Sequence, residues 1–78
     1  MIHVKLFGIA KDIIGSSTLN IEQELGTVEE LLIYLKYEYP KFKELTSLLV
    51  AINDEYANAT AIINSNDEVA LIPPVSGG

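Results

Sequence analysis

Residues 27–40, TVEELLIYLKYEYP, decide the fold, because they predict one long amphipathic helix in a chain of only 78 residues. Thr27 and Glu30 have the spacing of a capping box, in which the threonine hydroxyl accepts the backbone N–H of the glutamate and the glutamate side chain reaches back. The apolar side chains that follow share one stripe, formed by Val28, Leu31, Leu32, Leu35 and Tyr39. Pro40 ends the helix, because proline cannot continue its hydrogen bonds, and residues 41–46 have room for one further turn.

Strand-like segments flank this helix on both sides. They are short and rich in apolar residues, and they comprise residues 2–7, 18–22, 48–52 and 68–72, with a short edge strand near Tyr56. The first two alternate apolar and polar side chains, which is the period of a half-buried strand. The third is wholly apolar, which is typical of a central strand covered on much of both faces. Residues 10–14 predict a helical turn that Gly15 stops.

The order of these elements predicts an α+β domain. The first two strands are close enough to pair antiparallel, and the long helix then crosses over and covers one face of a mixed sheet of four to five strands. The other face of the sheet is left uncovered. We expect the domain to span residues 1–72, followed by an extended C-terminal tail at residues 73–78.

The composition excludes several classes of function. The chain has no cysteine and no arginine, and His3 is its single histidine, so we expect neither a metal site nor a cysteine nucleophile nor a histidine-based triad. Eleven acidic residues against five lysines give a formal net charge of −6, which argues against nucleic acid or an anionic membrane as a partner and favours a basic docking surface. Without a signal peptide or a membrane-spanning run, a cytoplasmic protein is expected.

The last six residues, PPVSGG at 73–78, are the most informative part of the chain for function. Pro73 and Pro74 lack amide donors, so the last strand ends and the chain leaves the sheet extended. A terminal Gly-Gly is either a frayed end or an arm thin enough to pass a narrow tunnel in another protein. The two prolines directly after a strand favour the arm.

Several segments together resemble a known family over essentially the whole chain. They are residues 4–8, 10–15, 27–31, 49–53 and 67–70 and, most specific of all, residues 73–78. In this order and at this length they resemble the small subunit of molybdopterin synthase, a family of ubiquitin-like (β-grasp) sulfur carriers. The absence of arginine departs from that family and means that ionic contacts must use lysine.

The resemblance implies a function at the C-terminal carboxylate. In that family an activating enzyme similar to the ubiquitin E1 core adenylates the last glycine, here Gly78, and the acyl-adenylate becomes a thiocarboxylate. The carrier then binds the large subunit, in a heterotetramer, and donates sulfur to precursor Z on the way to molybdopterin. Gly77, Ser76, Val75 and Pro74 would lie in the partner's channel. The carrier holds no stable cofactor and is no enzyme on its own, since the catalytic pocket is expected on the large subunit.

The resemblance also implies a docking surface. Phe7, Tyr56 and Ile72 stand where the family places an apolar patch used by both partners, and Phe7 and Ile72 lie opposite the core set of their strands. Three other aromatic residues, Tyr34, Tyr37 and Tyr39, are expected to cover the edges of the core. The adjacent acids at 54–55 and 67–68 are expected to be solvated turn residues, and His3 an exposed strand residue.

Two other interpretations stay open at this point. One is a related β-grasp carrier that serves thiamine synthesis, tRNA thiolation or protein modification, with the same chemistry at Gly78. Thiamine carriers tend to lack the two prolines before the tail, which favours the molybdopterin assignment. The other is a ubiquitin-like interaction module without covalent chemistry, whose tail is incidental.

Overall fold

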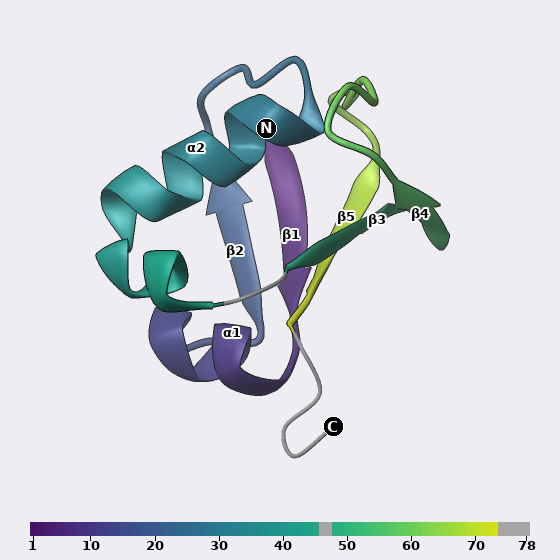
Figure 1. The fold of residues 1–78 in the computed structure, drawn as a ribbon. Coiled ribbons are helices and arrows are strands. Elements are labelled where there is room, and N and C mark those ends of the chain that lie inside the picture. The colour runs from purple at the N-terminus through teal and green to yellow at the C-terminus, as the bar shows by residue number, and fades with distance from the viewer. Residues whose placement is uncertain (46–47, 74–78) are drawn as a thin grey trace.

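The structure is a computed structural model that describes residues 1–45 and 48–73 of the chain. Along this part the elements are β1 (Ile2–Leu6), α1 (Gly8–Ile14), β2 (Thr18–Ile21), α2 (Val28–Glu38), the 3₁₀ helix η1 (Pro40–Glu44), β3 (Leu49–Ile52), β4 (Glu55–Ala57) and β5 (Glu68–Ile72). Figure 1 shows α2 lying across one face of the sheet, with α1 and η1 at the end where β5 stops. No helix within the described residues is long and apolar enough to cross a membrane.

The sheet is mixed and has the strand order β2-β1-β5-β3-β4. β1 pairs antiparallel with β2 and parallel with β5, while β3 pairs antiparallel with β5 and β4. The expected α+β fold with one main helix on a mixed sheet is therefore confirmed. The apolar run at residues 48–52 forms β3, which lies inside the sheet between β5 and β4, as expected of a central strand. The sequence predicts that much of both faces of this strand is covered, and Leu49 departs from that prediction because its side chain is about half exposed.

α2 begins as the sequence predicts, with one difference in its cap. The Thr27 hydroxyl accepts the Glu30 backbone N–H at 3.3 Å, but the Glu30 carboxylate accepts the N–H of Gly26, at 2.8 Å. The next free N–H groups, of Val28 and Glu29, donate to carbonyl oxygens of residues 61 and 59 at 3.0 and 2.9 Å. Carbonyl groups of the segment before β5 thus accept hydrogen bonds from the first N–H groups of α2, which have no partner within the helix.

The core lies between α2 and the sheet. Val28, Leu31 and Leu35 of the predicted stripe are fully buried, and they face the inward residues of the strands, which are Ile2, Val4, Leu6, Ile21, Val50, Val69 and Leu71. Phe42 of η1 is also fully buried and meets the ring of Tyr39 edge-on, with centroids 6.3 Å apart. The expected extra turn after Pro40 therefore exists and ends at Glu44, and it supplies a core aromatic residue.

Left-handed backbone conformations occur at the end of α1 and in the loop between β3 and β4. α1 begins at Gly8, two residues earlier than expected. Gly15 caps its end with a left-handed backbone and donates its N–H to the Lys11 carbonyl at 2.8 Å. β3 and β4 form a hairpin with a two-residue loop in which Asn53 and Asp54 both have positive φ, 51° and 71°. Asparagine and aspartate tolerate this conformation, which gives the strands their matching twist.

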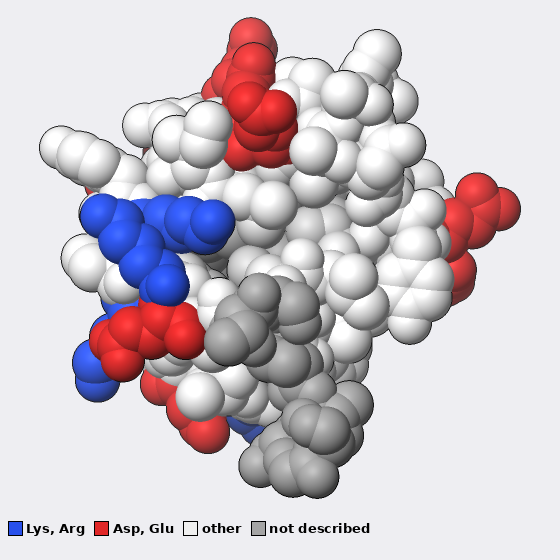
Figure 2. Space-filling view, in the orientation of Figure 1, with Lys and Arg blue, Asp and Glu red and all other residues white. Residues whose placement is uncertain are grey.

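Charged side chains are unevenly distributed over the surface. Figure 2 shows acidic side chains over the loop that leads into α2, and lysine side chains over the far end of α2 and η1. Residues 22–38 carry five glutamates and one lysine, so most of the net charge of −6 belongs to the loop and helix on the covered side of the sheet.

A candidate partner-binding face at the base of the tail

The predicted reactive residue and channel residues lie outside the described part of the chain. These are Gly78, Gly77, Ser76, Val75 and Pro74. The structure does place the base of the tail, because β5 ends at Ile72 and Pro73 follows it. The surface around Ile72 and Pro73 is therefore the described part of the chain that adjoins the tail.

Pro73 packs against the start of α1. Gly8 has φ +54°, and a Cβ atom added to it would stand 3.2 Å from Cγ of Pro73. This distance is shorter than ordinary van der Waals contact, and the positive φ also disfavours a side chain. A glycine at position 8 thus lets the chain leave β5 close to α1.

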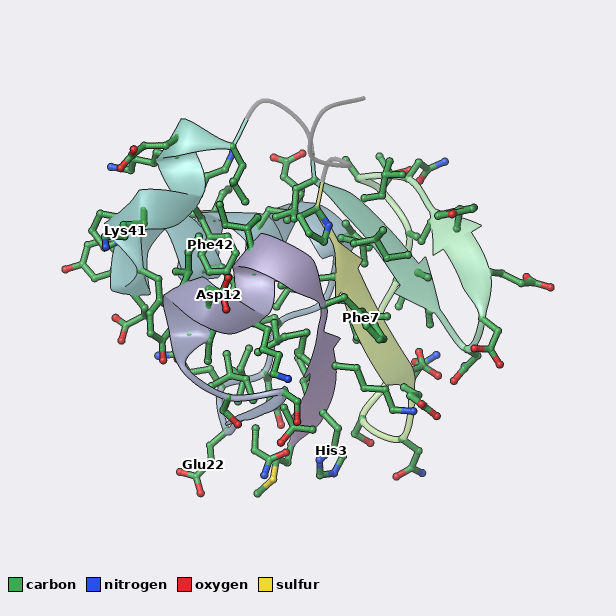
Figure 3. All side chains as sticks on the ribbon, turned by 90° about the horizontal axis from the view of Figure 1, so that it is seen from below. His3, Phe7, Asp12, Glu22, Lys41 and Phe42 are labelled. Atoms are coloured by element: carbon green, nitrogen blue, oxygen red, sulfur yellow. The ribbon has the colours of Figure 1, made fainter. Side chains whose placement is uncertain are left out.

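The structure places Phe7, Ile72 and Tyr56 on the uncovered face of the sheet. Phe7 follows β1 with extended backbone angles, φ −129° and ψ 155°, so it continues the alternation of that strand. It lies one residue beyond the parallel pair Leu6–Leu71, as does Ile72 on β5. Neighbouring residues at the same register share a face of the sheet, and Figure 3 shows the Phe7 ring against β5.

Residues of β3 join these three positions into one surface. Leu49 pairs with Ile72, and Ala51 pairs with Ala70 on one side and Tyr56 on the other. Opposite residues in antiparallel strands point to the same face. The apolar outer face is therefore defined by six residues: Phe7, Leu49, Ala51, Tyr56, Ala70 and Ile72. Tyr56 is 73% exposed, and Phe7 and Leu49 are about half exposed.

Leu49 is a member of this face that sequence reasoning missed. A wholly apolar strand gives no alternation from which to tell an inward from an outward side chain. Only the pairing of Leu49 with Ile72 of β5 could have shown that Leu49 faces outward, because successive residues of 68–72 alternate between the two sides of the sheet. That pairing becomes visible only once the strand order is known.

The other half of the uncovered face is polar. Nδ1 of His3 donates to Oδ1 of Asn20 at 2.7 Å across β1 and β2, and the Lys5 ammonium forms an ion pair with Glu68 across β1 and β5. The hydrogen bond and charge of Glu68 raise the pKa of Lys5 above its usual value. His3 is exposed, as predicted. The division of the sheet leaves its apolar part next to the base of the tail.

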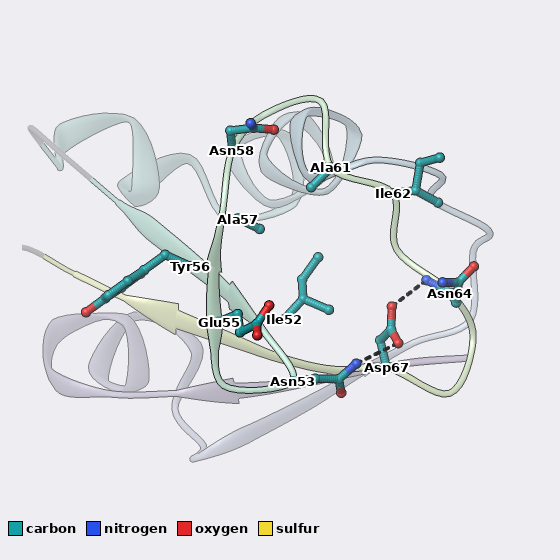
Figure 4. A pocket seen from close by; sticks show the side chains of 10 residues that line it. All are labelled: Ile52, Asn53, Glu55, Tyr56, Ala57, Asn58, Ala61, Ile62, Asn64 and Asp67. Carbon is teal, nitrogen blue, oxygen red and sulfur yellow. Dashed lines mark hydrogen bonds between the residues drawn. The ribbon is translucent and has the colours of Figure 1, made fainter.

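A groove beside β4 lies on the other side of the sheet from this face, since Ile52 in its lining pairs with the buried Val69. It measures about 530 Å³, and Figure 4 shows Ile52 and Asp67 lining it while Tyr56 points away. The Asp67 carboxylate accepts the Asn64 backbone N–H at 2.8 Å and the Asn53 side-chain amide at 2.9 Å. These two hydrogen bonds lower the pKa of Asp67 below its usual value. Asp67 therefore links the turn at residues 53–54 to the turn at residues 64–67 by hydrogen bonds, in agreement with the prediction of a turn residue.

A metal site needs several histidine, cysteine or acidic side chains close together. Across residues 1–45 and 48–73 no three histidine, cysteine or acidic side chains come close enough together to hold a metal ion. The described part of the face offers exposed apolar side chains beside the first residue of the tail. Such a surface suits contact with another protein.

A mixed five-stranded sheet packed on one main helix is the ubiquitin-like β-grasp fold. The chain belongs to the ThiS family, whose sequence profile matches residues 4–78. This membership and the fold agree with the resemblance found in the sequence.

Two relatives with established names match almost the full chain. The molybdopterin synthase sulfur carrier subunit of Arabidopsis thaliana is 38% identical over 99% of this chain and 82% of its own length. The protein of the same name from Dictyostelium discoideum is 40% identical over 96% of this chain and 93% of its own length.

Two solved structures share the fold. SAMP1 from Haloferax volcanii is 29% identical, with a TM-score of 0.80 over 99% of this chain and 98% of that one. A chain in the complex of subunits 1 and 2 of the molybdopterin-converting factor from Helicobacter pylori is 26% identical, with a TM-score of 0.68 over 99% of this chain and 97% of that one.

Proposed function

We propose that this chain is the sulfur carrier subunit of a molybdopterin synthase, and that its C-terminal carboxylate carries the sulfur. The observation that carries the proposal is the end-to-end match to two sulfur carrier subunits, each more than 35% identical to this chain over nearly its full length. The ThiS family match reaches the last residue, Gly78. In this proposal the small subunit is the sulfur carrier, and catalysis belongs to the large subunit.

The chemistry needs only the end of the chain. Attack of the Gly78 carboxylate on ATP releases pyrophosphate and forms an acyl-adenylate, so that AMP becomes a leaving group. A sulfide-level sulfur nucleophile then attacks the acyl carbon, AMP departs, and a thiocarboxylate remains. When the thiocarboxylate sulfur forms a bond to carbon of precursor Z, water cleaves the acyl C–S bond and restores the Gly78 carboxylate. The chain contains no cysteine, so no side chain competes for the sulfur.

Two partners follow from this chemistry. One is the large synthase subunit, and the Helicobacter pylori complex of subunits 1 and 2 supports such a pairing for a protein of this fold. The other is an E1-like activating enzyme that performs the adenylation. We propose that both partners bind the apolar outer face around Phe7, Tyr56 and Ile72, with Leu49 added, because this face adjoins the base of the tail. The synthase would be a heterotetramer with its catalytic pocket on the large subunit.

The carrier itself needs no resident cofactor. The acyl-adenylate and the thiocarboxylate are transient states of Gly78. The tail residues from Pro74 to Gly77 would occupy the channel of whichever partner holds the carrier. The acidic balance of the chain suits partners whose pockets bind ATP and a phosphorylated pterin, because such pockets are basic.

The test is reconstitution with purified partners. After incubation with the activating enzyme, ATP and a sulfur source, the intact mass of the carrier should rise by the difference between one sulfur and one oxygen. The thiocarboxylated carrier, mixed with the large subunit and precursor Z, should form molybdopterin. A variant lacking Gly78 should do neither. Thiocarboxylation without molybdopterin formation would remove the assignment to this synthase.

A second candidate is a carrier for another acceptor, such as thiamine synthesis, tRNA thiolation or protein modification. The structural match to SAMP1 from Haloferax volcanii favours keeping it, since that protein shares the fold over nearly its full length and is named small archaeal modifier protein 1. The same reconstitution separates the two, because activation at Gly78 is common to both and only the final acceptor differs. A binding module without covalent chemistry would tolerate loss of Gly78.

A further inference from the structure

The solvent side of α2 carries apolar and aromatic residues where an amphipathic helix normally has polar ones. Ile33 is 60% exposed and Tyr37 is 80% exposed. Together with Leu25 from the preceding loop and the half-buried Tyr34, they line a shallow groove of about 400 Å³. We call this surface, completed by Glu30 and Glu38, the α2 groove.

Tyr37 contradicts the expectation that the tyrosines of this region cover the core. Tyr39 does so, since it is half-buried and packs edge-on against the buried Phe42. Tyr34 is half-buried as well. The Tyr37 side chain instead stands in solvent, so burial in the core does not account for it. An exposed tyrosine beside an exposed isoleucine is the composition of a protein-binding surface.

The charge of the α2 groove specifies its partner. Its two charged lining residues, Glu30 and Glu38, are both acidic, and the loop and helix that build it carry five glutamates and one lysine. Glu38 and Tyr34 line the groove together, and burial, followed by the charge of Glu38, raises the pKa of Tyr34. The rings of Tyr34 and Tyr37 add faces that attract cations.

We propose that the α2 groove binds a basic amphipathic segment of a partner protein, with a lysine or arginine held between apolar side chains. The apolar side chains would contact Leu25 and Ile33, and the cation would lie near Glu38 and the ring of Tyr37. A second copy of this chain does not fit, because the same acidic residues would face each other.

This surface is separate from the apolar outer face. α2 packs on the covered side of the sheet (Figure 1), while Phe7 and Ile72 lie on the uncovered side. A partner on the α2 groove therefore leaves the base of the tail accessible, and two different proteins can hold the carrier at once. The inference does not depend on the sulfur chemistry of Gly78.

The test uses the full chain and two synthetic helical peptides, one built of leucine and arginine and the other of leucine and glutamate. The leucine–arginine peptide should shift the amide NMR signals of Leu25, Ile33 and Tyr37, and the leucine–glutamate peptide should not. The double variant Ile33→Ser/Tyr37→Ser should bind about tenfold more weakly, which corresponds to roughly 1.4 kcal/mol. Glu38→Gln should reduce both the affinity and its dependence on salt.

The chain offers a matched control on another surface. Ile62 and Tyr56 are 68% and 73% exposed, so the variant Ile62→Ser/Tyr56→Ser removes the same two residue types at similar exposure. It should bind the leucine–arginine peptide like the unmodified protein. Equal loss in both double variants, shifts spread over every acidic segment, or no binding would overturn the proposal. Sulfur transfer to precursor Z in the presence of the large subunit should be unchanged in Ile33→Ser/Tyr37→Ser, so that the two proposals fail independently.

Discussion

Leu49 and Ile72 lie directly opposite each other on neighbouring antiparallel strands, and both belong to the uncovered face of the sheet. This pairing links β3 to the last residue of β5, immediately before the tail. It joins exposed apolar side chains of separate strands into one surface beside Pro73.

Replacing Leu49 with aspartate should weaken binding of the large synthase subunit by at least about tenfold, because a charge would be buried without a partner in the interface. Phe7→Asp and Ile72→Asp should have the same effect. Affinity can be measured by calorimetry. Ile62→Asp is the control, since Ile62 is 68% exposed but lies outside the apolar outer face. An unchanged affinity in all three variants would exclude this face as the interface.

A side chain at Gly8 should displace Pro73 and with it the base of the tail. Gly8→Val introduces a Cβ atom 3.2 Å from Cγ of Pro73, and we expect shifted NMR signals of Pro73 and slower sulfur transfer. Gly15→Val is the matched control: Gly15 also has positive φ, but nothing lies within 4 Å of the added Cβ atom. Both variants should lose about 1–2 kcal/mol of stability from backbone strain. Identical sulfur transfer rates in the two would argue against a role for this contact.

Truncation of Phe42 should be severely destabilising. Its side chain is fully buried against Tyr39, and Phe→Ala in a core costs about 3–5 kcal/mol, which is a large part of the roughly 5–15 kcal/mol that stabilises a typical domain. Denaturant unfolding measures the loss. Lys43→Ala in the same 3₁₀ helix changes an exposed residue and should have little effect. A similar stability of both variants would contradict the placement of η1 on the core.

Asp67→Asn should destabilise the protein in a pH-dependent way. The pKa of Asp67 is lowered in the folded state by hydrogen bonds from Asn64 and Asn53. The contribution of the Asp67 carboxylate to the free energy of unfolding is therefore complete above its pKa in the unfolded chain, about 4. It is lost as the pH falls through the lower pKa of the folded protein. Unfolding midpoints of the variant and the unmodified protein should differ at pH 7 and converge in acid. Asp12→Asn, an exposed residue of α1 outside this network, should leave the midpoint unchanged at both pH values.

Local patterns in the sequence were sufficient for the elements themselves. The capping residues and apolar stripe of residues 27–40 predicted α2, and the alternation of residues 2–6 predicted which side of β1 is buried. These signals are local, because caps, helical periodicity and strand alternation act between residues a few positions apart. The Asn-Asp pair at 53–54 likewise marked the turn that its positive φ angles now explain.

The apolar outer face depended on contacts between residues far apart in the chain. Periodicity shows that two sides of a strand differ, but not which strand lies beside which, so Leu49 was expected to be covered and is half exposed. The same limit hid Phe42, whose burial depends on where the chain turns after Pro40. The sequence by itself determined the elements, the lack of cysteine and arginine and the Gly-Gly motif at 77–78, because these are properties of composition and local spacing. Only the tertiary structure decided that Leu49 lies on one surface with Phe7, Tyr56 and Ile72, because strand order and register join residues that are distant in sequence.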